Sequence, residues 1–152
     1  MKPLVIVAPH FRTMAEIFRP EALDRLLGFA EMTWAADEPM PQDKFEDALR
    51  EAVAVVFGTW HYGDALARGG PNVRAVLEVA GAHDHHDLGY ETCFARGIEV
   101  GSVAPAFGAA VAELALGLTL AVMRGIAEND RDFRNTRERW LHEGNVGYNL
   151  SL

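Results

Sequence analysis

The sequence predicts an α/β fold in which a flavodoxin-like parallel sheet carries helices on both faces and is followed by a long helix. Three observations predict it. Short apolar runs typical of strands recur along the chain, helical patterns separate them, and an extended apolar stretch lies at Val103–Met123. Strands that alternate with helices at short spacing form βαβ units, which build parallel sheets. With 152 residues, 49% of them hydrophobic, the chain can bury the core of one ordinary domain.

The first half of the chain begins with a buried strand. Leu4–Ala8 is a continuous apolar run of the kind found in strands that are buried on both faces. Pro20 suits the first turn of a helix, and leucines recur after it at helical spacing. A short strand is expected at Glu31–Trp34. Pro41 then opens a second helix, and Ala52–Phe57 has the pattern of the third strand.

Shorter elements complete the predicted sheet. A helix is expected at Asp64–Arg68, because the glycines and proline that follow break it. The fourth strand is predicted at Ala75–Val79. Tyr90–Arg96 forms a short helix that Gly97 caps, and Ile98–Val103 forms the fifth strand.

The last third of the chain is predicted to be mainly helical. One long helix is expected from about Phe107 to Arg124, and a second, highly charged helix at Asp130–Trp140. The segment Glu143–Asn149 is rich in turn residues and is expected to be an extended crossing segment. We therefore divide the chain into residues 1–106 and residues 107–152.

The apolar stretch is also long enough for a membrane span, since Glu113 is the only ionisable residue between Val103 and Met123. A carboxylate inside a bilayer is costly, however. Pro105, Gly108 and many alanines fit a helix packed on all sides inside a protein better. We therefore predict no membrane partner.

Charge and cysteine content narrow the function classes. The formal net charge of −8 argues against nucleic-acid binding, because neutralising phosphates requires a surplus of Lys and Arg on some face. Cys93 is the only cysteine, so the chain forms no internal disulfide. The sequence shows no secretory signal pattern at its start. These features favour a reducing, cytoplasmic location.

The most specific part of the sequence lies between Gly81 and Arg124. A polar turn leads to a helix ending at Arg96-Gly97, a strand beginning at Ile98 and an apolar run that contains Val111-Ala112-Glu113. This order resembles the D-isomer-specific 2-hydroxyacid dehydrogenases. Their substrate-binding domain has a Gly-Ala-Gly-x-Asp-type turn, an Arg-Gly-Ile step into a strand, and a Val-Ala-Glu at the start of a long interdomain helix.

The resemblance implies an enzyme that transfers a hydride between NAD or NADP and a 2-hydroxy or 2-oxo acid. Residues 1–106 would be its substrate-binding domain, and residues 107–152 interdomain helices and a crossing segment. The family's nucleotide-binding domain, which binds the cofactor and holds the catalytic residues, would start where this chain stops. We thus expect no catalytic residue here, an inactive chain when it is alone, and a homodimer at full length.

Candidate site residues follow from the predicted sheet. Ligands bind outside the carboxyl ends of parallel strands, and three loops leave such ends, at residues 9–12, 59–62 and 81–83. In the family that the chain resembles, the second and third loops hold the substrate carboxylate, largely through main-chain N–H groups, which suit an anion. The candidate substrate-binding residues are Trp60, His61, Tyr62, Gly81, Ala82 and His83. The alternative is that the side chains of Trp60 and Tyr62 only pack against the end of the sheet, and that His61 is a solvated loop residue.

Two residues of the long helix are assigned to the cofactor side by the same resemblance. Val111 matches a position that contacts the nicotinamide side. Phe107 lies where many relatives have a segment bearing Asn or Thr, and its ring cannot form their hydrogen bonds; this favours a bulkier or more apolar 2-oxo acid. Glu113 matches a hinge glutamate and is expected to be structural.

Other chemistries have less support. His83, His85 and His86 with Asp84 and Asp87 resemble metal ligands in type, but consecutive residues of one short turn rarely converge on one ion, so no metal site is predicted. The alternative function is a non-catalytic, flavodoxin-like module that binds an anion or another ligand. A phospho-receiver fits poorly, because Ala8-Pro9-His10 and Gly58-Thr59 lack the acidic residues that it needs. A flavodoxin fits poorly, because His10-Phe11-Arg12-Thr13 is a poor phosphate loop.

Overall fold

The computed structural model describes residues 1–81 and 86–135, except for the side chain of His86. The chain divides into two compact units, Met1–Ala106 and Phe107–Leu152.

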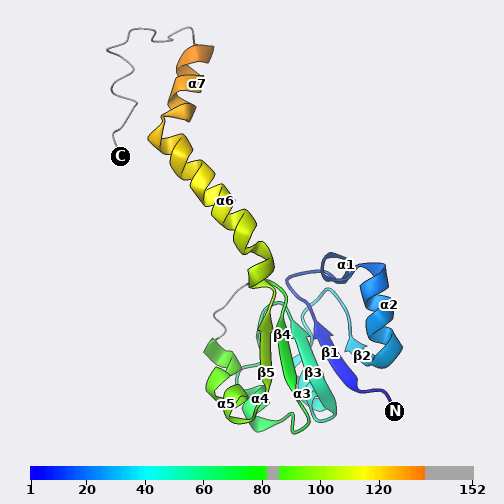
Figure 1. Cartoon of the computed structure of the whole chain (residues 1–152). Helices are drawn as coiled ribbons and strands as arrows, with labels where there is room; N and C mark the ends of the chain where they lie inside the picture. Colours follow the sequence, from blue (N-terminus) through cyan, green and yellow to red (C-terminus); the bar gives the residue numbers. More distant parts are fainter. Residues whose placement is uncertain (82–85, 136–152) are drawn as a thin grey trace. The chain divides into compact units, whose positions relative to one another are not determined.

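The first unit is built on a five-stranded parallel sheet (Figure 1). In spatial order, its strands are β2 (Glu31–Trp34), β1 (Leu4–Ala8), β3 (Ala52–Phe57), β4 (Ala75–Glu78) and β5 (Glu99–Ser102). The order β2-β1-β3-β4-β5 is that of the flavodoxin-like folds. The predicted fold class is therefore confirmed, and the five predicted strands are present, with β4 and β5 slightly shorter than expected.

Alternate residues of β1 enter two different cores. Ile6 and Ala8 belong to the larger cluster, which also contains side chains from α3 (Gln42–Leu49), α4 (Ala65–Arg68) and α5 (Tyr90–Ala95). Val5 and Val7 belong to the smaller cluster, which packs against α1 (Met14–Ile17) and α2 (Pro20–Phe29). Because successive side chains of a strand point to opposite faces, these two clusters show that helices cover both faces of the sheet.

The larger cluster includes the single cysteine of the chain. Cys93 on α5 is completely buried, and burial raises the pKa of its thiol, partly offset by the nearby charge of Arg96. Arg96 itself donates hydrogen bonds to the carbonyl groups of Leu66, Gly69 and Gly70. These hydrogen bonds connect the end of α5 to the end of α4 and the residues that follow it.

The helix α1 was not predicted from the sequence. Thr13 and Glu16 form a capping box at its start, in which the Thr13 N–H donates to Glu16 Oε2 at 2.8 Å. These hydrogen bonds from Thr13 lower the pKa of the Glu16 carboxyl. The Met14 N–H donates to Asp37 Oδ1, also at 2.8 Å. Four residues give too little apolar periodicity to predict a helix, so the capping residues are the only local signal for it.

The second unit contains the long helix α6 (Ala104–Met123), whose first residues belong to the first unit, and α7 (Ile126–Arg134). α6 begins three residues before the predicted start at Phe107, with Pro105 in its first turn, where proline is tolerated. Gly125, at φ +59°, separates it from α7. The predicted start of the charged helix at Asp130 was therefore wrong by one turn, and residues 136–140 of that prediction lie outside the described residues.

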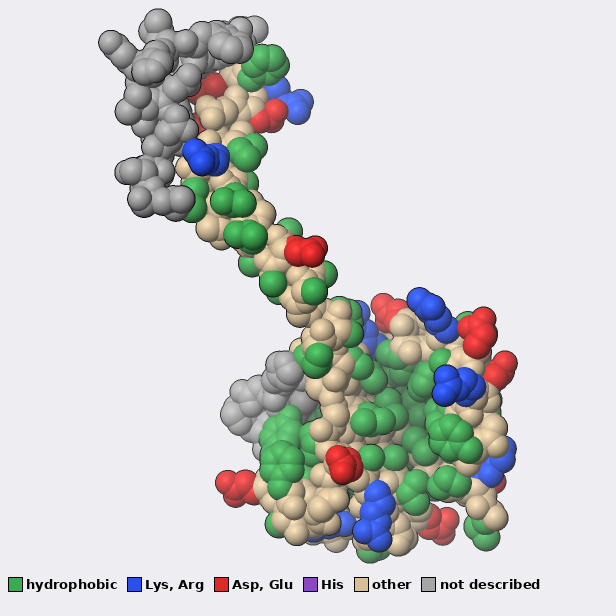
Figure 2. Space-filling view, in the orientation of Figure 1, with side chains coloured by type: hydrophobic (Ala, Val, Ile, Leu, Met, Phe, Trp, Pro, Cys, Tyr) green, Lys and Arg blue, Asp and Glu red, His purple; other side chains and the backbone are tan. Residues whose placement is uncertain are grey.

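Within residues 1–81 and 86–135, the long helix is not packed on all sides as predicted. α6 contains no buried residue, and Figure 2 shows hydrophobic side chains along its length. The large exposed apolar side chains are Phe107, Val111, Leu114, Leu116, Leu118, Leu120 and Val122. By length and composition alone, α6 is the one helix in the described part of the chain that could cross a membrane.

Candidate functional site

The carboxyl ends of three strands lie side by side at one edge of the sheet. In the strand register, Ala8 of β1 is the partner of Phe57 of β3, and Phe57 is the partner of Glu78 of β4. β2 lies on one side of β1 and β3 on the other, so the strand order reverses between β1 and β3. Open α/β sheets bind ligands at such a switch point. We therefore build the candidate site from the loops that follow β1, β3 and β4.

The loops after β1 and β3 are joined through their backbones. The Thr59 N–H donates to the His10 carbonyl at 2.7 Å, and the Gly58 N–H donates to the Ala8 carbonyl at 3.2 Å. Gly58 has no room for a side chain, because a Cβ would lie 2.0 Å from the Pro9 carbonyl oxygen. The residue type at position 58 is therefore fixed by the close approach of the two loops.

The side chains of two histidines, His10 and His61, lie near each other at this switch point. The ring centroids of His10 and His61 are 6.2 Å apart, with an angle of 41° between the ring planes. His61 is exposed, and His10 is half-buried with its Nδ1 3.2 Å from the Asp37 carbonyl oxygen. A proton on Nδ1 satisfies this contact and leaves Nε2 of His10 for another partner. His10 was not among the predicted site residues, although it lies in the loop that follows the first strand.

The predicted residues Trp60 and Tyr62 are core side chains. Both are buried, and they pack against Phe45 of α3: the Tyr62 ring stacks on it at 3.6 Å between centroids, and the Trp60 ring meets it edge-on at 5.6 Å. The Trp60 Nε1–H also donates to the Gly63 carbonyl at 2.8 Å. What these two residues offer a ligand is a fixed backbone, whereas His61 between them projects its side chain outward.

Burial of Tyr62 predicts a loss of stability in alkali. Burial raises the pKa of the Tyr62 phenol above its ordinary value of 10.0, although a backbone hydrogen bond with Met40 opposes this. The native state thus keeps a proton that the unfolded chain loses, so the Tyr62 contribution is complete below about pH 10 and is lost as pH rises beyond it. We expect the urea midpoint to fall above this pH and to fall less steeply in Tyr62→Phe.

The matched variant Tyr90→Phe, which retains Tyr62, should keep the full alkaline decline. Cys93, whose pKa is also raised, leaves a residual slope in both variants. Equal slopes for Tyr62→Phe and the wild-type chain would contradict the assignment.

The loop after β4 carries the third part of the candidate site. Glu78 ends the strand and is buried, and the Ala80 N–H donates to its Oε1 atom. Gly81 is partly exposed and has φ +84°, a conformation that favours glycine. The predicted residues Ala82 and His83 lie outside the described residues.

The two residues predicted on the cofactor side lie on α6 in the second unit. Phe107 and Val111 are 46% and 61% exposed, so both side chains are accessible. No cluster of three or more possible metal ligands occurs within residues 1–81 and 86–135. The predicted histidine-rich turn, which contains His83, Asp84 and His85, is outside these ranges.

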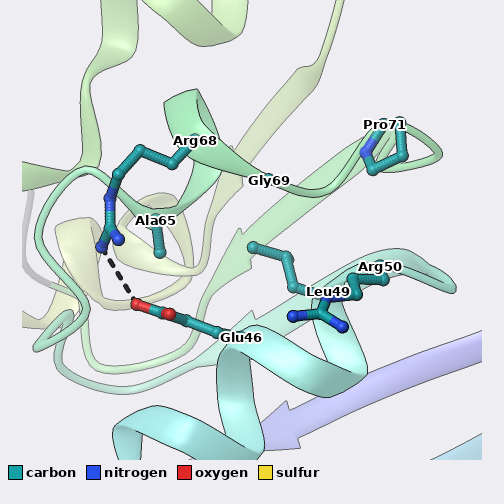
Figure 3. A pocket seen from close by; sticks show the side chains of 7 residues that line it. All are labelled: Glu46, Leu49, Arg50, Ala65, Arg68, Gly69 and Pro71. Carbon is teal, nitrogen blue, oxygen red and sulfur yellow. Dashed lines mark hydrogen bonds and ion pairs between the residues drawn. The ribbon is translucent and has the colours of Figure 1, made fainter.

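A pocket of about 340 Å³ lies at the opposite edge of the sheet, near the amino ends of β3 and β4 (Figure 3). Its two arginines are already paired: Arg68 contacts Glu46 at 3.0 Å and Asp64 at 2.7 Å, and Arg50 contacts Asp47 at 3.4 Å. Hydrogen bonds from Gln42 and then from Arg68 lower the pKa of the Glu46 carboxyl. Because carboxylates already occupy the guanidinium groups, this pocket is a poor anion site.

The fold and the sequence are similar to those of solved enzyme structures. A phosphoglycerate oxidoreductase from Rhizobium etli is 34% identical, and the match covers 95% of this chain and 44% of that chain, with a TM-score of 0.66. The holo form of Rhodotorula graminis D-mandelate dehydrogenase is 18% identical over 98% of this chain and 44% of its own, with a TM-score of 0.60. A glyoxylate reductase from Paecilomyes thermophila is 14% identical over 90% and 42%, also with a TM-score of 0.60.

The last two similarities show the fold alone. The chain spans less than half the length of each of these three proteins. No protein-family model matches the sequence, and no curated protein matches it.

Proposed function

Since this chain belongs to the D-2-hydroxyacid dehydrogenase family, we propose that it is the substrate-binding half of an NAD(P)-dependent oxidoreductase that interconverts 2-hydroxy and 2-oxo acids. The parallel sheet order and the 34% identity to the Rhizobium etli oxidoreductase support this proposal. The chain corresponds to 44% of that protein's length, so the activity of a complete enzyme is part of the proposal. A homodimer at full length and a cytoplasmic location are further expectations from the family.

The switch point between β1 and β3 carries the proposal. There the Thr59 N–H fixes one loop to the carbonyl of His10, and the imidazoles of His10 and His61 lie 6.2 Å apart. Rigid backbone amides suit a carboxylate, and imidazole nitrogens can donate to further substrate oxygens. We assign the carboxylate to the loops at residues 59–62 and 81–83, and a second contact to His61.

The cofactor does not fit the first turn of this chain. A dinucleotide site needs a glycine-rich turn that leads into a helix whose amino end faces the pyrophosphate. The turn after β1 is Pro9–Arg12, which contains no glycine, and α1 has only four residues. Phe107 and Val111 are the residues that we propose to face the nicotinamide.

What these residues would do is bind and orient the substrate. When fixed donors hold the carboxylate, C2 of the acid is kept in one position. The oxygen on C2 then remains free to contact a proton donor. Because no Gly-x-Gly-x-x-Gly motif occurs in the sequence, we propose that the chain alone binds 2-oxo acids without oxidising NADH or NADPH.

Calorimetric titration of the chain with glyoxylate and with phenylpyruvate tests this proposal. We expect saturable binding of at least one acid, tighter for phenylpyruvate if the site favours apolar substrates. His61→Ala should weaken it about tenfold, which corresponds to about 1.4 kcal/mol. The control Arg50→Ala, in the pocket of Figure 3, should leave the affinity unchanged.

Two results would contradict the assignment. If Arg50→Ala loses binding and His61→Ala keeps it, the anion binds in the pocket of Figure 3 and not at the switch point. Absence of binding for both acids would remove support for the substrate-binding role itself. Binding that persists without turnover when a nucleotide-binding partner domain is supplied would instead favour a non-catalytic ligand-binding module.

A further inference from the structure

We propose that Glu78 is a positioning residue. Its buried carboxylate fixes the loop after β4 relative to the first residue of α6. The inference rests on the proposed function only for its effect on substrate affinity. Its structural part stands on the contacts of Glu78 and can be tested without a ligand.

Glu78 is unusual in this fold because it is charged and only 4% exposed. Within the described residues it is the one charged side chain in the core. A buried carboxylate is costly unless hydrogen bonds satisfy its oxygens. An apolar side chain of similar size would not carry this cost, so packing alone does not explain a glutamate at this position.

The two oxygens of Glu78 are used in different directions. Oε1 accepts the N–H of Ala80, two residues along the loop that leads to Gly81. Oε2 accepts the hydroxyl of Ser102 on β5 at 2.7 Å. The Ser102 oxygen in turn accepts the N–H of Ala104, the first residue of α6, at 3.1 Å. One carboxylate therefore links the loop of the candidate site to the start of the long helix.

Backbone contacts reinforce this arrangement at the same point. The Val103 N–H donates to the Glu78 carbonyl at 3.1 Å, and the Val79 N–H donates to the Phe57 carbonyl at 2.9 Å. Glu78 is thus placed by β3 on one side and by the residue before α6 on the other. We therefore expect that replacing the Glu78 side chain alters both the loop after β4 and the start of α6.

Two pockets border Glu78 and Ser102. A cavity of about 190 Å³, lined by Leu88 and Tyr90 among others, reaches Glu78 and Ser102. Another cavity of about 280 Å³, lined by Phe18 and Val79 among others, reaches the same two residues. The hydrogen bonds of Glu78 and Ser102 therefore fix the two side chains at a point where neighbouring atoms leave space beside them.

The test compares Glu78→Gln with a matched control, Glu99→Gln. Glu99 is an exposed glutamate on the neighbouring strand β5. A glutamine at 78 can accept only one of the two hydrogen bonds and must donate at the other position. We expect the amides of Ala80 and Ala104 to exchange with solvent at least tenfold faster in Glu78→Gln, and at unchanged rates in Glu99→Gln.

A second variant guards against simple unfolding. Ser102→Ala removes the hydroxyl at the surface end of the link, and should accelerate exchange at Ala104 while the urea midpoint stays close to that of the wild-type chain. Unchanged exchange at Ala104 in this variant, or at both amides in Glu78→Gln, would overturn the proposed link.

The affinity for glyoxylate and phenylpyruvate separates this inference from the proposed function. We expect Glu78→Gln to weaken binding about tenfold. Faster exchange at Ala80 with unchanged affinity would overturn the positioning role toward substrate and leave the substrate site intact. If the wild-type chain binds neither acid, the proposed function fails, and the exchange rates alone decide whether the carboxylate links the two segments.

Discussion

Replacing Phe45 by alanine should lower the free energy of unfolding by about 3–5 kcal/mol, the range for truncating a buried phenylalanine. Phe45 is 0% exposed, and both aromatic residues of the candidate loop, Trp60 and Tyr62, pack on its ring. The variant therefore creates a cavity directly beneath this loop. Urea denaturation followed by tryptophan fluorescence measures the change.

Phe29 provides the matched control for this truncation. It ends α2 and is 63% exposed, so Phe29→Ala should change the free energy of unfolding by about 0.5 kcal/mol or less. Similar losses in the two variants would contradict the core that the structure assigns to Phe45. A large loss only in Phe45→Ala, together with weaker binding of 2-oxo acids, would tie the aromatic cluster to the candidate site.

Gly58→Ala should cost about 3 kcal/mol and disturb the site at the same time. The added Cβ would lie 2.0 Å and 2.5 Å from the carbonyl oxygens of Pro9 and His10, which are backbone atoms and cannot rotate away. The loops after β1 and β3 would have to separate. The hydrogen bond from Thr59 to His10 would then lengthen, and we expect the affinity for glyoxylate and phenylpyruvate to fall.

Gly28→Ala is the appropriate comparison. Gly28 lies in α2, and apart from its chain neighbours and the backbone of its own helix no atom lies within 4 Å of an added Cβ. Alanine favours helices over glycine by up to about 1 kcal/mol. This variant should be equally stable or more stable than the wild-type chain. If Gly58→Ala unfolds at the same urea concentration as Gly28→Ala, the close contact of the two loops is not present in solution.

The sheet could be predicted from sequence because its strands are continuous apolar runs. Leu4–Ala8 and Ala52–Phe57 are buried on both faces, and this pattern needs no information from distant residues. The four-residue helix α1 escaped prediction, since its stability depends on Asp37, which accepts the N–H of Met14 from another part of the chain. The exposure of α6 does not follow from its apolar composition, because that composition predicts burial without specifying what covers the helix.

The candidate site was predictable only in part. Loops at the carboxyl ends of strands follow from the strand order, and His61 was predicted as a site residue in this way. The partner role of His10 depends on a ring separation of 6.2 Å that only the fold determines. Glu78 gave no signal as a functional residue, because a single glutamate at the end of a strand is common, and its burial is a property of the assembled sheet.

The burial of Cys93 gives this chain a built-in reporter of transient opening. A thiol that is fully enclosed and has a raised pKa reacts with an alkylating reagent only when the surrounding core separates, because the thiolate is the reactive form. Since the sequence contains no second cysteine, the labelling rate reports one event at one place. Phe45 and Cys93 belong to the same cluster, so the rate of alkylation in native buffer would rank core variants without denaturant.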